Sequence, residues 1–232
     1  MESGNHFVDS LAPGDLALLQ PHLKAVALKR DESLAEIGRP VRAAFLPIDS
    51  IISVITAMRD GRLVESRTIG REGGFGLLHA LGSDVSFESV ITQVPGRCFV
   101  IPAAALASAA SHSPTLVRQI VQHAQATIVQ AAQWTGCNAL HETRERLCRW
   151  LLLTQDRLGK DLLPLTQEHL SIMLGVQRTT VTLVASQLQR EHLISYSRGR
   201  VEILDRSGLK AMACECYAAV EEAVQQVLEP GY

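Results

Sequence analysis

The chain has 232 residues, enough for one large domain or two small ones, and its 47% apolar and 20% charged residues are typical of a soluble globular protein. It contains no run of 18 apolar residues and no basic-then-apolar leader, so we predict no membrane span and expect the protein in the cytoplasm. The net charge of −2 does not by itself indicate a polyanionic partner.

Residues 1–112 contain short apolar runs separated by turns, which is typical of a compact β-barrel or jelly roll. The runs 51–58 and 63–69 flank Asp60–Gly61, a pair that predicts a hairpin with a type I′ turn. A glycine-dense loop follows at 70–76. The remaining predicted elements are a second hairpin, formed by 90–94 and 97–101 around Pro95–Gly96, and short strands at 25–29 and 42–46.

A long helix is predicted from Ser113–Pro114 to about Leu140, because a hydroxyl residue caps a helix and proline suits its first position. At about 1.5 Å per residue it would be roughly 40 Å long. Its apolar residues recur at spacings of three and four, so a second identical helix could cover them in a dimer; burial within one subunit is the alternative. The predicted dimer interface contains Val117, Ile120, Val121, Ala124, Ile128, Ala131 and Thr135.

After a hinge near 138–142 and a second helix at 143–153, the chain contains a helix-turn-helix pattern. Thr166 can cap a short helix that Gly175 ends in a left-handed conformation. The helix that follows buries Val181, Val184 and Leu188.

The outward side of that following helix predicts DNA binding. Its first turns would meet base edges in the major groove, where arginine can bind guanine and glutamine can bind adenine. A β-hairpin "wing" at 193–204 would present arginines to phosphates, and residues 170–200 have a local charge of +3. The predicted DNA-binding residues are Thr166, Gln177, Arg178, Thr179, Thr180, Thr182, Arg198 and Arg200.

These segments resemble the cyclic-AMP receptor protein/FNR (Crp/Fnr) family of transcriptional regulators over nearly the whole chain. The resemblance is carried by the Asp60–Gly61 hairpin, the glycine loop before Leu77, the long helix, and the stretches 146–152 and 165–181. It implies an α+β fold with a cyclic-nucleotide-binding-like β-roll sensor domain (1–112), a central dimerisation helix (113–141) and a winged helix-turn-helix domain (142–232). It also implies a homodimer that binds palindromic double-stranded DNA, with RNA polymerase as a partner.

The sequence departs from the family at two sites. The commoner Ser-Arg-Glu start of the reading helix is Gln177–Arg178–Thr179 here, which removes an acceptor for cytosine. In the sensor domain the Gly-Glu pair and the arginine that bind a cyclic nucleotide are missing, so we predict that cyclic AMP does not bind tightly. The positions of the effector pocket implied by the resemblance are Gly73, Gly74, Phe75, Gly76, Leu77, Ser86, Ala131 and Ala132.

We predict no cofactor and no metal site. The N-terminus lacks the cysteine cluster of the iron–sulfur branch, and the lone His79 does not indicate haem. The five cysteines include no CxxC pair, so we expect reduced, buried thiols. Cys214 and Cys216 could instead bind metal or sense oxidation, but two ligands alone do not make a metal site. The cysteines are Cys98, Cys137, Cys148, Cys214 and Cys216.

Two other functions remain open at this point. One is a scaffold or co-regulator whose winged domain binds protein instead of DNA. The other is a cupin-like metal enzyme, although residues 1–112 lack a closely spaced histidine pair and we assign no catalytic residue. The segment 207–228 is predicted to be an additional amphipathic helix that packs on the winged domain.

Overall fold

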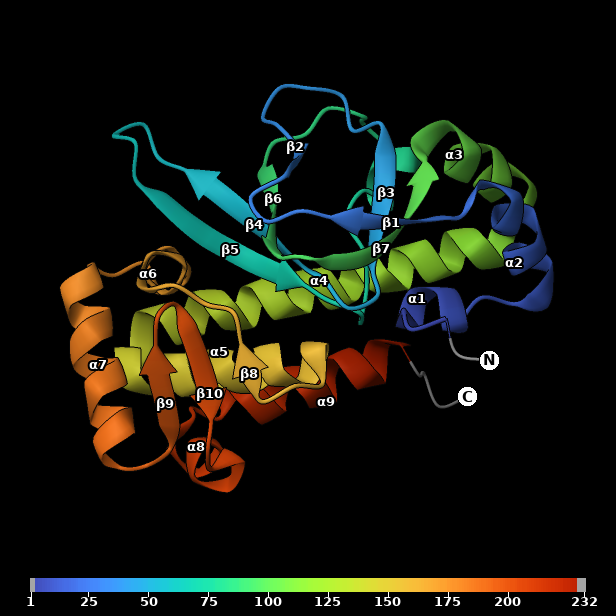
Figure 1. Cartoon of the computed structure of the whole chain (residues 1–232). Coiled ribbons are helices and arrows are strands. Elements are labelled where there is room, and N and C mark those ends of the chain that lie inside the picture. The colour runs from blue at the N-terminus through green and yellow to red at the C-terminus, as the bar shows by residue number, and fades with distance from the viewer. Residues whose placement is uncertain (1–2, 229–232) are drawn as a thin grey trace. The chain divides into compact units, whose positions relative to one another are not determined.

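The structure is a computed structural model that describes residues 3–228. These residues form two compact units (Figure 1). The first contains 3–57 and 67–128, and the second contains 58–66 and 129–228. No helix among the described residues is both long enough and apolar enough to cross a membrane.

The first unit is built on two antiparallel sheets, as the alternating sequence pattern predicts. One sheet has the order β1-β7-β3 and the other β2-β6-β4-β5. Residues from both sheets, including Leu28, Val54 and Val90, form one buried cluster between them. The strands are β1 (Lys24–Leu28), β2 (Ser33–Ala35), β3 (Ala43–Pro47), β4 (Ile51–Ala57), β5 (Leu63–Ile69), β6 (Ser89–Val94) and β7 (Gly96–Pro102). Residues 63–66 of β5 are assigned to the second unit.

The loop between β4 and β5 differs in its turn type from the prediction. Gly61 has a φ of +84°, but Asp60 does not adopt positive φ, so the predicted type I′ turn is wrong. The N–H of Gly61 donates to the carbonyl of Met58 at 3.0 Å, as in a type I turn followed by a left-handed glycine. The Asp60 carboxylate accepts the backbone N–H of Arg62 at 3.1 Å, which stabilises this loop.

The predicted hairpin around Pro95–Gly96 is also wrong, because β6 and β7 lie in different sheets. The chain crosses from one sheet to the other at this point. A Cβ atom on Gly96 would lie 2.5 Å from the backbone oxygen of Asp49, so only glycine fits there. The Asp49 carboxylate binds the side chain of Arg97 at 2.8 Å and also accepts its backbone N–H, and these contacts replace hairpin pairing.

Helices cover one end of the first unit. They are α1 (His6–Asp9), α2 (Pro13–Leu19), the 3-10 turns η1 (Gln20–His22) and η2 (Leu78–Ala80), and α3 (Ala103–His112). The alanine-rich α3 was not predicted. Their buried cluster includes Phe7, Leu19 and Leu106, and it also takes in Leu116 and Ile120 from the next helix.

That next helix, α4 (Pro114–Leu140), has the predicted bounds (Figure 1). The Ser113 hydroxyl accepts the backbone N–H of Leu116 at 3.1 Å, so the capping residue was predicted correctly. The dimer prediction needs one correction, because Ile120 is fully buried in the core of its own unit and cannot face a second subunit. By contrast, Val121 is 43% exposed and Ile128 is 67% exposed.

The second unit is the winged helix-turn-helix. Its helix α5 (Thr143–Leu158) begins with a capping box at Glu142 and continues five residues past the predicted end, to a left-handed Gly159. The sheet has the order β8-β10-β9. The other elements are β8 (Leu162–Leu163), α6 (Gln167–Leu174), α7 (Arg178–Arg190), β9 (Ile194–Ser197), β10 (Arg200–Ile203), α8 (Arg206–Met212) and α9 (Cys216–Leu228).

The prediction of a single helix over 207–228 is wrong, because this segment forms two helices, α8 and α9. Ala213 is extended, with ψ of 148°, and ends α8. Cys214 and Cys216 are both buried. In a continuous helix two residues at this spacing would point about 200° apart, so they could not both face the interior.

Candidate nucleic-acid interface

The turn between α6 and α7 is fixed by two local features that the sequence predicts. The Thr166 hydroxyl accepts the backbone N–H of His169 at 3.2 Å and caps α6. Gly175 ends α6 with a φ of +63°, a conformation that glycine adopts without steric cost. The helix-turn-helix prediction is therefore confirmed, with the second helix starting at Arg178.

The second helix, α7, has one buried and one exposed side. Val181, Val184 and Leu188 are buried, as predicted from their spacing. On the other side the first turns carry polar side chains that face solvent, while Thr180 is half-buried. The exposed predicted residues are Gln177, Arg178, Thr179 and Thr182.

The wing, defined here as the β9–β10 hairpin (194–203), has a two-residue turn. Arg198 and Gly199 have φ values of +49° and +73°, so both central residues are left-handed, as a type I′ turn requires. Ser197 pairs with Arg200 at the base of this turn. Arg198 and Arg200 are both exposed at the tip.

An open groove of about 620 Å³ lies between the reading helix α7 and the wing. It brings together four predicted residues, Thr166, Arg178, Thr182 and Arg198. The other four, Gln177, Thr179, Thr180 and Arg200, do not line it. The groove also contains residues that the sequence analysis missed, and these are Gln167, Ala185, Ser186, Gln189, Tyr196, Ser197 and Gly199.

Some of the missed residues could have been found from helical spacing. Ser186 follows Thr182 by four residues and Arg178 by eight, so the three share one side of α7. Helical spacing could not have identified Tyr196, because it lies on β9 and reaches the groove through a contact between this strand and α7. Its backbone N–H donates to the side-chain oxygen of Gln189 at 2.8 Å. Burial raises the pKa of Tyr196, so its hydroxyl stays protonated and can donate to a phosphate.

The arginines of this surface are available for a ligand. Among the described residues, Arg178, Arg198 and Arg200 form no ion pair with an acidic side chain. The only acid between 170 and 200, Glu191, is already paired with Arg144. The three arginines therefore remain unpaired with acids among the described residues, although the wing itself contains one acidic residue, Glu202.

The side chain of Thr182 is exposed, but its hydroxyl proton is not available to a ligand. Its hydroxyl donates to the backbone carbonyl of Arg178 at 2.9 Å. The hydroxyl proton is therefore used within the helix, and the side chain offers an oxygen acceptor and a methyl group. An acceptor suits the amino group of adenine or cytosine, and a methyl group suits thymine.

Solved structures of other proteins share this fold. FixK2 from Bradyrhizobium japonicum is 16% identical, with a TM-score of 0.70 and coverage of 83% of this chain and 98% of that one. A CRP/FNR-family transcriptional regulator from Thermus thermophilus is 22% identical, with a TM-score of 0.65 and coverage of 82% and 98%. At these identities the likeness shows the fold, and it confirms the predicted α+β class.

Two sequence matches identify the domain that contains this surface. Residues 145–212 match the Crp-like helix-turn-helix domain. The transcriptional regulator SdrP from Thermus thermophilus is 25% identical over 75% of this chain and 85% of its own. The chain therefore has the helix-turn-helix DNA-binding domain of a Crp/Fnr-type transcriptional regulator. The matched domain contains the capped turn, the reading helix and the wing described above.

The glycine loop of the regulator's first unit packs tightly on strand β3. A Cβ atom on Gly74 would lie 2.2 Å from the Leu46 side chain, and one on Gly76 would lie 2.6 Å from the backbone oxygen of Ala43. Phe75 forms backbone hydrogen bonds of 2.9 Å with Phe45 in both directions. Packing on β3 therefore explains Gly74 and Gly76, and Gly73, Phe75 and Leu77 are also buried. Their assignment to an effector pocket stays a prediction.

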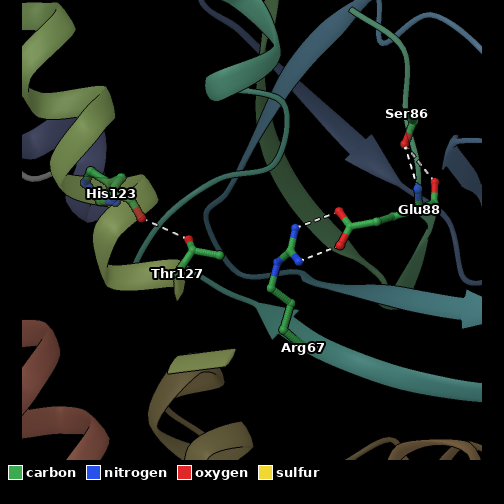
Figure 2. Close-up of polar contacts among 5 residues, drawn as sticks. All are labelled: Arg67, Ser86, Glu88, His123 and Thr127. Carbon is green, nitrogen blue, oxygen red and sulfur yellow. Dashed lines mark hydrogen bonds and ion pairs between the residues drawn. The ribbon is translucent and has the colours of Figure 1, made fainter. Parts of the chain in front are cut away.

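The first unit contains a half-buried ion pair that the sequence analysis missed (Figure 2). Arg67 binds both carboxylate oxygens of Glu88, at 2.6 and 2.8 Å. Ser86 is buried, and its hydroxyl donates to the backbone oxygen of Glu88 at 2.8 Å while it accepts the N–H of Glu88. Ala131 and Ala132 belong to the second unit, and their assignment to an effector pocket stays a prediction.

Two histidines of this unit are held by aromatic packing. The His79 ring lies 5.3 Å from the ring of Phe75, and burial lowers its pKa. The ring of His123, on α4, packs edge-on against Phe7 at 4.9 Å. The backbone oxygen of His123 accepts the hydroxyl of Thr127 at 2.9 Å (Figure 2).

Proposed function

We propose that this regulator binds, as a homodimer, a two-fold symmetric duplex in the cytoplasm and reads its sequence through the exposed start of α7. The observation that carries the proposal is the groove in which Arg178 and Thr182 face the wing, with arginines that have no acidic partner among the described residues. Arg178 is the candidate for a two-bond contact with guanine, and Arg198 and Arg200 are candidates for phosphate contacts.

The dimer is supported by the free side of α4. Val121, Ile128 and Thr135 are exposed and seven residues apart, and half-buried Ala124 and Ala131 lie between them. This is the spacing of a two-helix seam, and the alanines permit close approach. Two copies related by two-fold symmetry would bring their reading helices to successive major grooves, roughly 34 Å apart.

The test is selection of bound fragments from genomic DNA by the purified full-length chain. We expect a palindrome whose half-sites are centred about one helical turn, roughly ten base pairs, apart. A selection by the Ile128→Asp variant serves as the matched control, because it should lose the paired half-sites without changing α7. Enrichment of no sequence, or of single half-sites by the unmodified chain, would contradict the proposal.

For the sensor domain the proposal is that cyclic AMP is not the effector. A cyclic phosphate needs a cationic partner when it is buried. The Arg67 guanidinium is already neutralised by Glu88, and the Ser86 hydroxyl is used by the backbone. We expect no heat of binding in calorimetry with cyclic AMP. Micromolar affinity of the unmodified chain for cyclic AMP would overturn this proposal. Glu88→Gln removes the carboxylate that neutralises Arg67, so any weak binding should appear first in this variant.

The same proposal treats the chain as a DNA-binding protein without catalytic activity, and it includes RNA polymerase as the partner through which transcription changes. The match to the Crp-like helix-turn-helix domain supports both points. A protein-binding scaffold would retain its partner when Arg178 is changed and would select no duplex, so the selection experiment distinguishes that alternative from the proposal.

A further inference from the structure

Four side chains that can bind metal converge in the second unit, and neither the sequence motifs nor the DNA-binding surface accounts for them. They are Cys137 in the last turn of α4, His141 just after it, and Cys214 and Cys216 at the break between α8 and α9. Their ligand atoms all lie within 4.8 Å of one another. We propose that these four residues bind one zinc ion, in a structural site that joins the end of α4 to the α8–α9 break.

The distances fit tetrahedral coordination. Zinc–sulfur bonds of about 2.3 Å place two sulfur ligands about 3.8 Å apart in a regular tetrahedron. The sulfur atoms of Cys137 and Cys214 are 3.5 Å apart, and the Cys216 sulfur is 3.6 Å from Nδ1 of His141. All four ligand atoms lie within 4.8 Å of one another. The widest pair therefore needs to close by no more than about 1 Å for the four atoms to surround the ion.

The surroundings of the cluster match those of known zinc ligands. Nε2 of His141 lies 3.1 Å from both carboxylate oxygens of Glu215, which leaves the lone pair of Nδ1 directed at the cysteines. A histidine that binds metal through one nitrogen usually donates the other N–H to such a group. The side-chain amide of Gln133 donates to the sulfur of Cys216 at 3.0 Å. Such a bond stabilises a thiolate.

The charge balance also favours a cation with thiolates. Three thiolates, a neutral histidine and Zn²⁺ have a net charge of −1. Arg149 is buried beside the cluster, where it stacks on Trp134 at 3.8 Å, and its Nε has no hydrogen-bond partner among the described residues. A buried arginine needs a compensating negative charge, and the zinc–thiolate group supplies it.

The composition of the cluster separates it from ordinary buried cysteines. Thiols alone pack well in an apolar core, as Cys98 and Cys148 do in this chain. An apolar core gives no reason for a histidine and a third cysteine to meet them. Four protein ligands also leave no open position, which is the pattern of a structural site and not of a catalytic one.

The experiment measures metal in the full-length chain, purified under reducing conditions, before and after incubation with Zn²⁺ and removal of excess. We expect one zinc per chain in the unmodified protein and in the matched controls Cys98→Ala and Cys148→Ala. We expect less than about one-tenth of that in Cys137→Ala, Cys214→Ala and Cys216→Ala. Glu215 contacts His141 and not the metal, so its replacement should have a smaller effect than the loss of a cysteine. We expect Glu215→Gln to weaken zinc affinity about 10- to 100-fold.

A second measurement needs no variant. Titration of the metal-free chain with Co²⁺ should produce the absorption of tetrahedral cobalt with thiolate ligands, saturating at one equivalent and reversed by Zn²⁺. Zinc content far below one per chain after reconstitution, an octahedral cobalt spectrum, or equal metal in all cysteine variants would overturn the proposal. So would a Cys137–Cys214 disulfide found by mass spectrometry in protein kept reduced. These outcomes are independent of DNA binding.

Discussion

Replacing Arg178 with alanine tests the reading helix at its exposed cation. The side chain has no ion-pair partner among the described residues, so its removal should change the stability of the fold by no more than about 0.5 kcal/mol. A two-bond arginine–guanine contact contributes about 1–3 kcal/mol to discrimination between bases. A dimer uses the contact twice, so we expect a loss of about 2–6 kcal/mol per operator, which is roughly a 30-fold to 20,000-fold increase in Kd.

The assay is a fluorescence anisotropy titration of the selected operator and of duplexes with each base pair substituted at the contacted position. The unmodified chain should distinguish these duplexes, and Arg178→Ala should bind them alike. Arg190→Ala is the control, because Arg190 is also exposed on α7 but lies in its last turn. An equal loss for every duplex, including a random one, would refute the reading function and leave Arg178 as a phosphate contact.

The remaining predictions concern charge, assembly and pH. Arg200→Ala should weaken binding to all duplexes and reduce the slope of log K against log salt by about 1 per half-site; an unchanged slope contradicts this. Ile128→Asp should give a folded monomer in analytical ultracentrifugation, whereas Ile120→Ala should lower the free energy of unfolding by about 2–5 kcal/mol. Burial lowers the pKa of His123 from 6.5 to about 4, against an opposing contribution from Glu72. Between pH 6.5 and about pH 4 the His123 ring is protonated in the unfolded state but not in the folded state. The free energy of unfolding is therefore highest above pH 6.5 and decreases as the pH falls toward 4. Urea unfolding should give a difference of about 2 kcal/mol between about pH 7 and about pH 5 that His123→Phe removes.

The features that the sequence predicted well are those that short segments determine. Ser113 and Thr166 accept hydrogen bonds from N–H groups three residues ahead, and Gly175 needs only its own backbone freedom. The bounds of α4 and the helix-turn-helix follow from such contacts. The open groove could be predicted in part, because α7 alone determines which of its residues face outward.

The features that were missed depend on contacts between distant segments. Gly96 packs on Asp49, 47 residues earlier, and the chain therefore changes sheets at a place where local signals indicate a hairpin. Arg67 and Glu88 are 21 residues apart, and Cys137 and Cys214 are 77 apart. The spacing Cys137-x3-His141 puts two ligands on one side of a helix and was a usable signal, but only the α8–α9 break brings the other two.

The burial pattern of α4 explains how a second copy could bind without displacing any core contact. Residues seven apart in a straight helix differ in direction by only about 20°, so Val121, Ile128 and Thr135 form one exposed line. In each unit the buried positions of α4 lie on the side roughly opposite to that line. They are Leu116, Ile120, His123 and Ala126 in the first unit and Trp134 and Cys137 in the second. Val121 and Ile128 are exposed apolar side chains that belong to the core of neither unit. An aspartate at Ile128 should for this reason prevent association while leaving both cores intact.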